Sequence, residues 1–373
     1  FISIVLLHNH YQYLSIINYG NDIQTYYNAR SAVLLTLQQQ NLDKQQLDYP
    51  YRQFKYHLTN SDTTIVDVEP YGMYSKYQSI SKIKRSKSER TFIIGRESDD
   101  RFRKALVIGD TRNPVIVTGK TSIKGDVLVG PQGVKPGVIR GIGFKGERIV
   151  EGGIEKDIKS GLPSLYVQSL FEQRSRLQNL ASMDYNQFSI SGRKLYLKNQ
   201  NLSLNQDALE SLKKDNIDFI IGPGKIICYD NIEITDLNIL NQVTIYSDSS
   251  ISIAGTATSK NILVFANKFF IGGPVQLGGQ FYAQSHFEIA NAAQIKYPSV
   301  IGLISNQFWP DNTLLSIGQN AEVNGFVFIH NFIDANRIFK YTLNVDALAI
   351  VNGVTYSDMY TDCLLYTSPS PRD

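Results

Sequence analysis

The chain has 373 residues, of which 42% are hydrophobic and 19% charged, and a formal net charge of +3. This composition excludes a wholly disordered or collagen-like chain, and the net charge is too small for the length to indicate a nucleic-acid partner. The two cysteines exclude a disulfide framework and a cysteine-rich zinc module.

Residues 1–40 predict a truncated membrane anchor followed by an exit helix. The apolar run Phe1–Leu7 is shorter than the 20 or so residues that cross a bilayer, so we expect it to end a longer span. No Lys or Arg precedes Arg30, and cytoplasmic flanks are usually rich in these residues. We therefore expect inner-membrane anchoring in the cell envelope, with the bulk of the chain periplasmic or at the surface. A buried helix start in a soluble protein is the alternative.

The exit helix resembles that of minor pilin-like and pilus-assembly proteins. Its apolar residues recur at three- and four-residue spacing, at Leu14, Ile17, Ala29, Ala32, Val33 and Leu37. Mature type IV pilins carry Glu at the fifth position, whereas this chain has Val5. The resemblance is therefore confined to the helical pattern.

Residues 41–104 are polar and rich in tyrosine, and we expect them to be irregular. The segment Lys76–Lys104 holds ten basic and four acidic residues. One interpretation is a patch for a polyanion or a lipid headgroup. We favour a solvated loop or strand face, because acidic residues dilute the charge and aromatic residues for base stacking are not interleaved.

Residues 105–160 predict a small β-rich region, and residues 161–216 a helical connector. Val117, Ile123 and Val129 are six residues apart, and such hexads resemble in part the left-handed β-helix of acyltransferases. In the connector we expect one helix over about 164–181 and a shorter one starting near Asp207, which could cap it.

Residues 217–362 predict a β-solenoid domain. Seven positions are spaced by six, and so are the seven that precede them by two: Phe265, Ile271, Leu277, Ala283, Ile289, Ile295 and Ile301, with Leu263, Phe269, Val275, Phe281, Phe287, Ala293 and Ser299. Upstream pairs Ile232/Ile234, Val243/Ile245 and Ile251/Ile253 and downstream pairs Leu315/Ile317 and Phe326/Phe328 extend the pattern. We expect parallel coils of roughly 18–20 residues. An antiparallel β-sandwich is the alternative.

No motif predicts a catalytic, cofactor-binding or metal site. Gly141–Gly146 matches G-x-G-x-x-G but precedes strand and turn residues instead of a helix, and Gly119–Thr121 lacks the first glycine of a phosphate loop. The residues weighed as candidates are His286 as a general base, the carboxylates Asp230, Glu233, Asp236, Asp248 and Glu288, and the pair His8 and His10 for a metal. No cofactor is predicted.

The whole pattern is mainly β, with solenoid regions, a long N-terminal helix and a helical connector. It resembles bactofilin-like polymer-forming β-helix proteins and anchored pilus-assembly proteins. The last segment, 363–373, resembles a translated sequencing adapter. The resemblance implies a non-enzymatic structural, adhesive or assembly protein, with itself, other envelope proteins or a glycan as partners. A polysaccharide-acting enzyme or glycan-binding β-helix, and a minor pilin-like assembly subunit, are the alternatives.

Overall fold

The protein is mainly β, as the sequence predicts, with an N-terminal helix. The computed structural model describes residues 2–42, 51–59, 62–95, 100–107, 114–117, 123–139, 142–156, 165, 167–305, 313–331, 341–345 and 349–357. The chain divides into two compact units, Phe1–Glu97 with Tyr166–Gln173, and Ser98–Leu165 with Arg174–Asp373. Within the described ranges, no helix is both long enough and apolar enough to cross a membrane.

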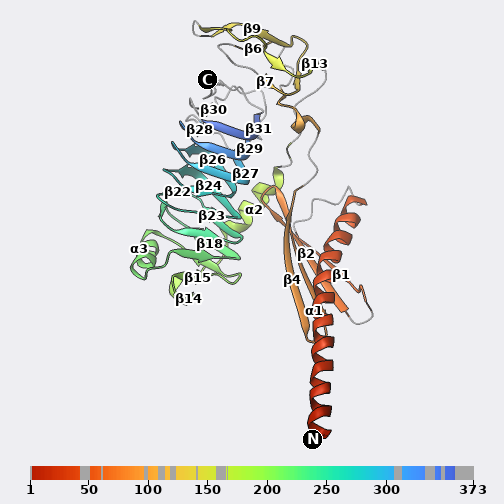
Figure 1. Cartoon of the computed structure of the whole chain (residues 1–373). Coiled ribbons are helices and arrows are strands. Elements are labelled where there is room, and N and C mark those ends of the chain that lie inside the picture. Colours follow the sequence, from red (N-terminus) through yellow and green to blue (C-terminus); the bar gives the residue numbers. More distant parts are fainter. Residues whose placement is uncertain are drawn as a thin grey trace. The chain divides into compact units, whose positions relative to one another are not determined.

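The first unit consists of helix α1 (Ile2–Leu42) and an antiparallel sheet (Figure 1). The strands pair in chain order, β1 (Arg52–Tyr56), β2 (Asp62–Tyr71), β3 (Tyr74–Ile83) and β4 (Ser86–Ile94). Ala32 and Val33 of α1 pack with Val66, Val68 and Tyr77 of the sheet. The helix is therefore held by its C-terminal half.

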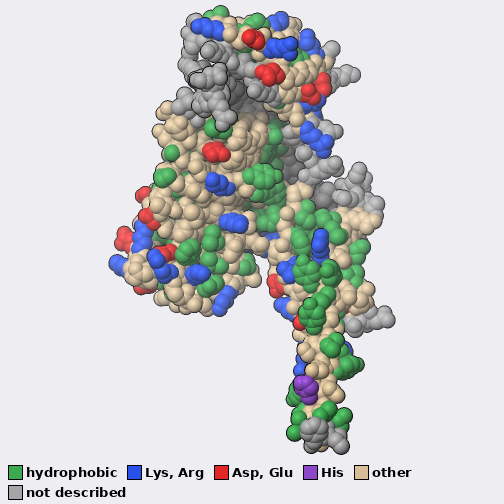
Figure 2. Space-filling model, viewed as in Figure 1, with side chains coloured by type: hydrophobic (Ala, Val, Ile, Leu, Met, Phe, Trp, Pro, Cys, Tyr) green, Lys and Arg blue, Asp and Glu red, His purple; other side chains and the backbone are tan. Residues whose placement is uncertain are grey.

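The N-terminal half of α1 is exposed and carries apolar side chains. Ile4, Leu6, Tyr11, Ile16 and Tyr19 are each more than 60% exposed. Figure 2 shows hydrophobic side chains along this part of the helix. The helix expected at the start of the chain is thus present, and its first half has no described partner in the sheet.

The expectation that residues 41–104 are irregular is wrong, because strands β1–β4 occupy 52–94. Burial alternates strictly along most of β2, but the inward side chains include Asp62 and Thr64, and β3 turns Ser79 and Ser81 inward. An alternation of small polar residues does not produce the apolar signal by which strands are recognised. Of the basic residues in this segment, Lys87 pairs with Glu89 on an exposed strand face, whereas Lys76, which pairs with Glu69, is only 13% exposed.

Asp62 links α1 to the sheet from a buried position. Its carboxylate accepts hydrogen bonds from Asn28 Nδ2 (2.8 Å), Thr64 Oγ1 (3.2 Å) and the backbone N–H of Thr59 (2.7 Å). Only 3% of the residue is exposed. Each donor would remain buried or half-buried without this acceptor, so the carboxylate holds helix, strand and loop together.

Replacing Asp62 with alanine is expected to lower the unfolding free energy of the first unit by about 2–3 kcal/mol, since buried donors lose their acceptor. Hydrogen exchange of α1 and β2 amides measures the loss in the full chain. Asp67→Ala is the control, because the Asp67 carboxylate accepts its hydrogen bonds from Tyr51 and Gln53 in an exposed setting. Equal exchange rates in the two variants would contradict the assignment.

The second unit begins with short strands in residues 106–156, where the small β-rich region is expected. They are β5 (Leu106–Val107), β6 (Val115–Val117), β7 (Ile123–Lys124), β8 (Val127–Val129), β9 (Val134–Pro136), β10 (Val138–Ile139), β11 (Ile142–Gly143), β12 (Val150–Glu151) and β13 (Ile154–Lys156), preceded by the 3-10 turn η1 (Asp100–Arg103). The pairs β5–β8, β8–β13, β6–β9 and β7–β12 are parallel, and β10–β11 is antiparallel.

The connector holds the two expected helices and several short strands. The elements are α2 (Gln168–Gln178), η2 (Tyr185–Gln187), β14 (Ser189–Ser191), β15 (Lys194–Tyr196), β16 (Asn201–Ser203) and α3 (Gln206–Lys214). The cap of α3 is Asn205, whose side chain accepts from the N–H of Ala208, so the prediction of Asp207 is wrong by two positions. Both are good capping residues, and the extended backbone at Asn205 decides between them.

From β15 onward, almost every strand pairs in parallel with a strand further along the chain. The strands are β17 (Phe219–Ile221), β18 (Gly224–Cys228), β19 (Ile232–Thr235), β20 (Asn238–Leu240), β21 (Val243–Ser247), β22 (Ser250–Ala254), β23 (Ser259–Lys260), β24 (Ile262–Ile271), β25 (Gln276–Leu277), β26 (Gly279–Ile289), β27 (Gln294–Ser305), β28 (Thr313–Ile317), β29 (Glu322–Asn331), β30 (Tyr341–Val345) and β31 (Ile350–Ser357).

These strands form three parallel ladders. We call them ladder A (β15, β17, β20, β23), ladder B (β16, β18, β21, β24, β26, β27, β29, β31) and ladder C (β19, β22, β24, β26, β28, β30). In ladder B, Ile226 pairs with Ile245 and Ile245 pairs with Val264. The step, meaning the number of residues between two paired positions, is therefore the same twice in succession. In ladder C, the step from Leu315 to its partner Leu343 is longer. The step is therefore regular first and lengthens toward the C-terminus.

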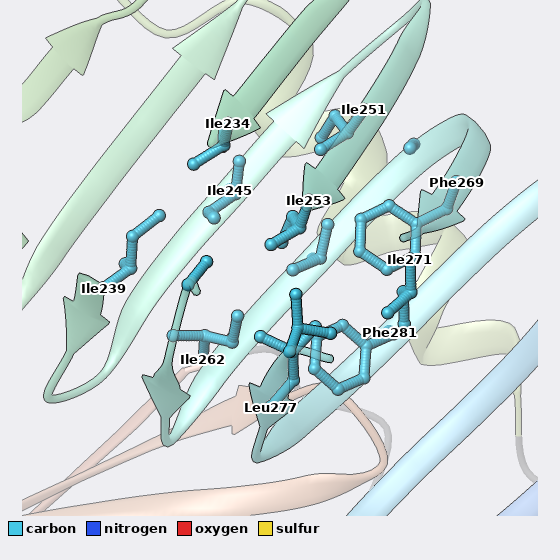
Figure 3. Packing of buried hydrophobic residues seen from close by; sticks show 14 of the residues in the cluster. Ile234, Ile239, Ile245, Ile251, Ile253, Ile262, Phe269, Ile271, Leu277 and Phe281 are labelled. Atoms are coloured by element: carbon cyan, nitrogen blue, oxygen red, sulfur yellow. The ribbon is translucent and has the colours of Figure 1, made fainter. Parts of the chain in front are cut away.

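One apolar core runs between the ladders, and the hexad positions supply much of it (Figure 3). Six of the seven predicted positions belong to this core: Ile271, Leu277, Ala283, Ile289, Ile295 and Ile301. Phe281 lies against Phe269 with ring centroids 5.6 Å apart, and Phe269 meets Phe287 edge-on at 5.2 Å. The six-residue spacing thus identified the inward side chains of this region.

At two places the predicted inward side chains face the other way. Phe265 and Leu263 are buried outside the core cluster, and the register of β24 shifts between Ala266 and Lys268. A shift in the ladder exchanges the two faces of a strand, so the first hexad is out of phase. In β29 the pair Phe326/Phe328 likewise lies outside that cluster, where Val327 and Ile329 belong to it. Apolar residues on both faces of β29 left its orientation ambiguous.

Candidate functional site

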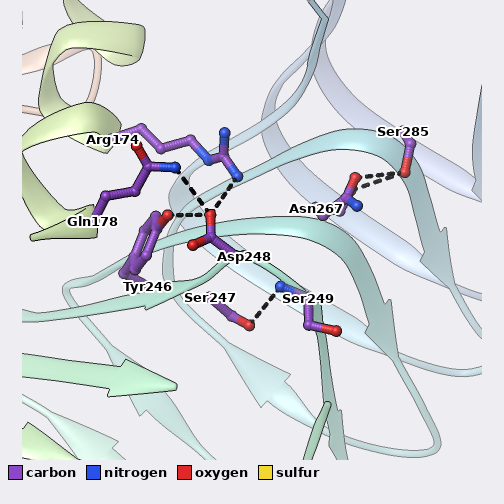
Figure 4. A network of polar contacts seen from close by, with 8 residues as sticks. All are labelled: Arg174, Gln178, Tyr246, Ser247, Asp248, Ser249, Asn267 and Ser285. Atoms are coloured by element: carbon purple, nitrogen blue, oxygen red, sulfur yellow. Dashed lines mark hydrogen bonds and ion pairs between the residues drawn. The ribbon is translucent and has the colours of Figure 1, made fainter. Parts of the chain in front are cut away.

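A polar cluster on the ladders surrounds Asp248, just beyond the end of β21 (Figure 4). The Asp248 carboxylate accepts hydrogen bonds from Tyr246 Oη, from Gln178 Nε2 (3.2 Å) and from the Arg174 guanidinium (3.3 Å). The Arg174 guanidinium also lies 5.7 Å from the centre of the Tyr246 ring. The contacts of Arg174 and Gln178 join the C-terminal turns of α2 to ladder B.

This cluster is built as an attachment of α2 to the sheet. Asp248 was a sequence candidate for carboxylate chemistry, but Arg174, Gln178 and Tyr246 were not linked to it. The long separation in sequence between Asp248 and its donors on α2 leaves no local signal that could have found them. All three donors bind one carboxylate oxygen, Oδ1, and the Asp248 side chain is 56% exposed, so these contacts fix where the carboxylate lies without covering it.

Burial, and next to it the hydrogen bond to Asp248, raise the pKa of the Tyr246 hydroxyl above its usual value of 10.0. The unfolded chain therefore releases this proton at a lower pH than the folded chain does. It follows that the unfolding free energy falls as pH rises above about 10.

Replacing Tyr246 with phenylalanine is expected to lessen this alkaline loss of stability. Urea denaturation between about pH 9 and pH 11 measures it, with Tyr229→Phe, at an exposed tyrosine, as the control. Identical pH dependence in the wild type and Tyr246→Phe would contradict the role given to the buried hydroxyl.

His286 and Glu288 lie together on the outward face of ladder C. His286 Nε2 is 3.4 Å from Glu288 Oε2, and the ring of Phe270 lies 5.2 Å from the imidazole. The two side chains are 25% and 49% exposed. They alternate with the buried Phe287 and Ile289, so they stand on a flat strand face. The pair is accessible, but no described residue is found beside it that could serve as the third member of an acid–base set.

The remaining carboxylate candidates lie on and beside β19. Asp236 accepts from both the N–H and the hydroxyl of Thr256, and these bonds lower the pKa of its carboxyl. Glu233 points outward on β19, and Asp230 is exposed in the preceding turn. Over the described part of the chain, no three His, Cys, Asp or Glu side chains group as metal ligands would. Asp230, Glu233 and Asp236 are therefore not part of a three-ligand metal site among these residues.

The other motifs also lack the surroundings that a site would need. His8 and His10 are exposed on α1 and lack the third ligand that a metal would need in the described residues. β11 is followed by irregular backbone with bends instead of a helix, as expected for a chance G-x-G-x-x-G match. Gly119–Thr121 lies outside the described residues. Burial raises the pKa of the Cys228 thiol to about 12, which makes it a poor nucleophile.

Small polar residues at the corner between ladders B and C bond from one strand level to the next. Asn231 Oδ1 accepts from the N–H and the hydroxyl of Ser250 (3.1 and 2.7 Å). Further along the stack, Ser285 Oγ donates to Asn267 Oδ1 at 2.8 Å (Figure 4). These contacts satisfy polar atoms where the chain turns and hold successive levels in register.

Comparison with known proteins adds no relative. The chain matches no family model, and neither a curated protein nor a solved structure is significantly similar to it. Its function must therefore be argued from its own geometry.

Proposed function

We propose that ladders A, B and C are the three walls of a β-solenoid, and that this protein is a non-enzymatic structural or adhesive protein that presents the solenoid as a rigid rod. Parallel pairing at equal steps along the chain, as from Ile226 to Ile245 to Val264, is what stacked coils require. The core that unites the ladders, continuous from Leu195 to Ile329, is the observation that carries the proposal.

Stacked coils are suited to a mechanical role. Each coil buries its apolar side chains only against its neighbours, so the rod resists bending wherever that contact is unbroken. Buried aromatic residues such as Phe269 and Phe281 add contact area between levels. The polar contacts at the corners, such as Asn231 with Ser250, tie the same levels at the surface.

The proposed place of action is the bacterial cell envelope, anchored at the inner membrane with the bulk of the chain outside the cytoplasm. This part rests on the sequence, namely the apolar run Phe1–Leu7 and the absence of Lys and Arg before Arg30. The exposed apolar side chains on the first half of α1 are consistent with it.

A polysaccharide-acting enzyme or glycan-binding β-helix is the first alternative. The observation in its favour is the outward pair His286 and Glu288 beside the half-buried ring of Phe270. Clustered carboxylates on one face would strengthen it. Asp236 and Asp248, however, are each occupied by hydrogen bonds that hold the fold together.

A minor pilin-like assembly subunit is the second alternative. It is favoured by α1, whose C-terminal half packs on an antiparallel sheet while its N-terminal half displays Ile4, Leu6 and Ile16. Such an apolar helix end is expected to bury itself in a membrane or among other helices. This role is compatible with a rigid rod in the second unit.

Incubation of the full chain with isolated bacterial cell walls tests the proposal. We expect the protein to sediment with the walls and to release no reducing sugar ends. Protein that stays in the supernatant would contradict the adhesive role. Release of reducing ends, abolished in His286→Ala and in Glu288→Gln but retained in Asp230→Asn, would instead establish the enzymatic alternative.

A further inference from the structure

Strand β27 carries an insertion that neither neighbouring level has. Between its pairs with Val323 and Gly325 of β29, β27 has the three residues 296–298, whereas β29 has only one. The strands of the preceding level, β25 and β26, likewise have two residues, 278 and 279, where β27 has the four residues 296–299. Residues 296–298 therefore form a bulge, and bulges often lie beside functional sites, where they redirect a side chain.

The bulge is held in place by hydrogen bonds from both neighbouring levels. On one side, the N–H of Gly279 donates to Ser299 Oγ (3.1 Å), and the Ser299 hydroxyl donates to the carbonyl of Lys296. On the other side, Asn324 Nδ2 donates to the carbonyl of Ile295 (3.1 Å). Ser299 is only 2% exposed, so its hydroxyl closes the base of the bulge from a buried position.

The bulge presents the aromatic ring of Tyr297 to solvent. Tyr297 is 80% exposed, the largest value for a bulky apolar or aromatic side chain in the part of the chain that the structure describes. The ring contributes little to the stability of the fold, because little of its apolar surface is buried. An aromatic ring on a well-anchored base is instead suited to pack against a ligand.

Polar side chains border the bulge on the outward face of β25, β27 and β29. Gln294 pairs in register with Gln276 on one side and with Glu322 on the other. Lys296 Nζ donates to Gln294 Oε1 at 2.7 Å. Asn324 Nδ2 donates to Glu322 Oε1 at 3.0 Å. These five side chains carry one charge of each sign, and their amides both donate and accept hydrogen bonds, which suits an uncharged ligand rich in hydroxyl groups.

We propose that Tyr297 and the amides beside it bind an uncharged glycan, with one sugar ring stacked on the tyrosine and its hydroxyl groups bonded to amides such as Gln294. This inference rests on the proposed adhesive function and names its ligand and its binding surface. The C–H bonds on one face of a sugar ring are apolar and slightly positive, which matches the negative face of an aromatic ring.

Two other classes of ligand match this surface less well. Protein interfaces are anchored by clusters of apolar and aromatic side chains, whereas amides and two opposite charges lie in register beside this ring. A polyanion requires a basic patch, and Lys296 is accompanied by Glu322 on the same face.

Sedimentation of the full chain with insoluble chitin, an uncharged β-linked glycan, and with isolated bacterial cell walls tests the proposal. We expect the wild type and Tyr297→Trp to bind both, and Tyr297→Ala to bind about tenfold more weakly or worse. Tyr229→Ala is the matched control, since Tyr229 is 58% exposed elsewhere on the second unit, and we expect it to bind like the wild type. Circular dichroism verifies that each variant is folded.

The outcomes separate this site from the adhesive function on which it rests. Wall binding that Tyr297→Ala retains in full would overturn the site and leave the adhesive function standing. Binding to chitin alone, dependent on Tyr297, would uphold the site and contradict the wall as its place of action. A wild type that binds neither material would contradict both. Wall binding that depends on Tyr297 without any binding to chitin, or binding abolished by raised salt, would overturn the uncharged glycan as the ligand.

Discussion

Gly325→Ala is expected to remove at least about 3 kcal/mol from the unfolding free energy of the second unit. Gly325 has a φ of +153°, and a Cβ at this position would overlap the carbonyl oxygen of Ser299 on the preceding level. That oxygen belongs to the backbone of the ladder and cannot move without breaking strand pairing. The same conformation recurs at Gly279 and Gly353, so close backbone stacking is a repeated feature of this corner.

Urea denaturation followed by circular dichroism measures the effect. Gly272→Ala is the matched control, because its added Cβ would meet only Ala254 Cβ at 3.4 Å and the carbonyl of Ile253 at 4.0 Å. We expect the control to change the unfolding free energy by less than about 1 kcal/mol. If Gly325→Ala were as stable as the control, the levels could not be stacked as closely as described.

Phe281→Ala is expected to cost about 4 kcal/mol, within the range for aromatic truncation in a packed core. The Phe281 side chain is fully buried, and its ring stacks on that of Phe269 with an angle of 16° between their planes. Truncation leaves a cavity between two levels of the stack, which the neighbouring backbone cannot close.

Phe270→Ala supplies the comparison for this core variant. Phe270 follows Phe269 directly but faces outward and is only half-buried. We expect it to cost less than about 1.5 kcal/mol, as measured by the same denaturation. Similar losses in the two variants would mean that the inward and outward faces of ladders B and C are assigned wrongly.

The apolar core of the ladders could be predicted from sequence because inward positions recur with a constant step. Ile271, Leu277 and Ile289 were found by a spacing of six, since an even step keeps a strand residue on one face. The prediction assigned two residues to the wrong face of their strands. Phe265 lies where the register of β24 shifts, and Phe328 lies on a strand whose two faces are both apolar.

The first unit could not be predicted in the same way. Its sheet buries Thr64, Ser79 and Ser81, and α1 contributes the buried Asn28, which donates to Asp62. The polar residues that led to the prediction of an irregular segment are thus, in part, buried between the helix and the sheet. Beside the apolar packing of Ala32 and Val33, that interface depends on hydrogen bonds between residues distant in sequence, and periodicity carries no information about such pairs.

The polar cluster at Asp248 shows the same limit in the second unit. Sequence inspection named Asp248 for its carboxylate, and the structure gives it three donors from two elements. The donors from α2 are far along the chain, so their meeting depends on the tertiary fold. The sequence therefore identified Asp248 as a carboxylate of interest, but it did not predict that this carboxylate binds α2.

Spin-label distances between Glu233 and Ser316 test the stacked-coil account most directly. Both residues face outward on ladder C, and the register places them four levels apart, through Ser252, Phe270 and Glu288. Labels at Glu233→Cys and Ser316→Cys, in a chain with Cys363→Ser and the buried Cys228 retained, are predicted to lie about 19 Å apart, at about 4.8 Å per level.

The pair Glu233→Cys and Glu288→Cys, three levels apart, is predicted to give a shorter distance of about 14 Å. Two narrow distributions that differ by one level would support the parallel stack. Broad distributions, or a distance beyond about 30 Å for the first pair, would contradict it, because two residues so far apart in sequence would then not share one face of a ladder.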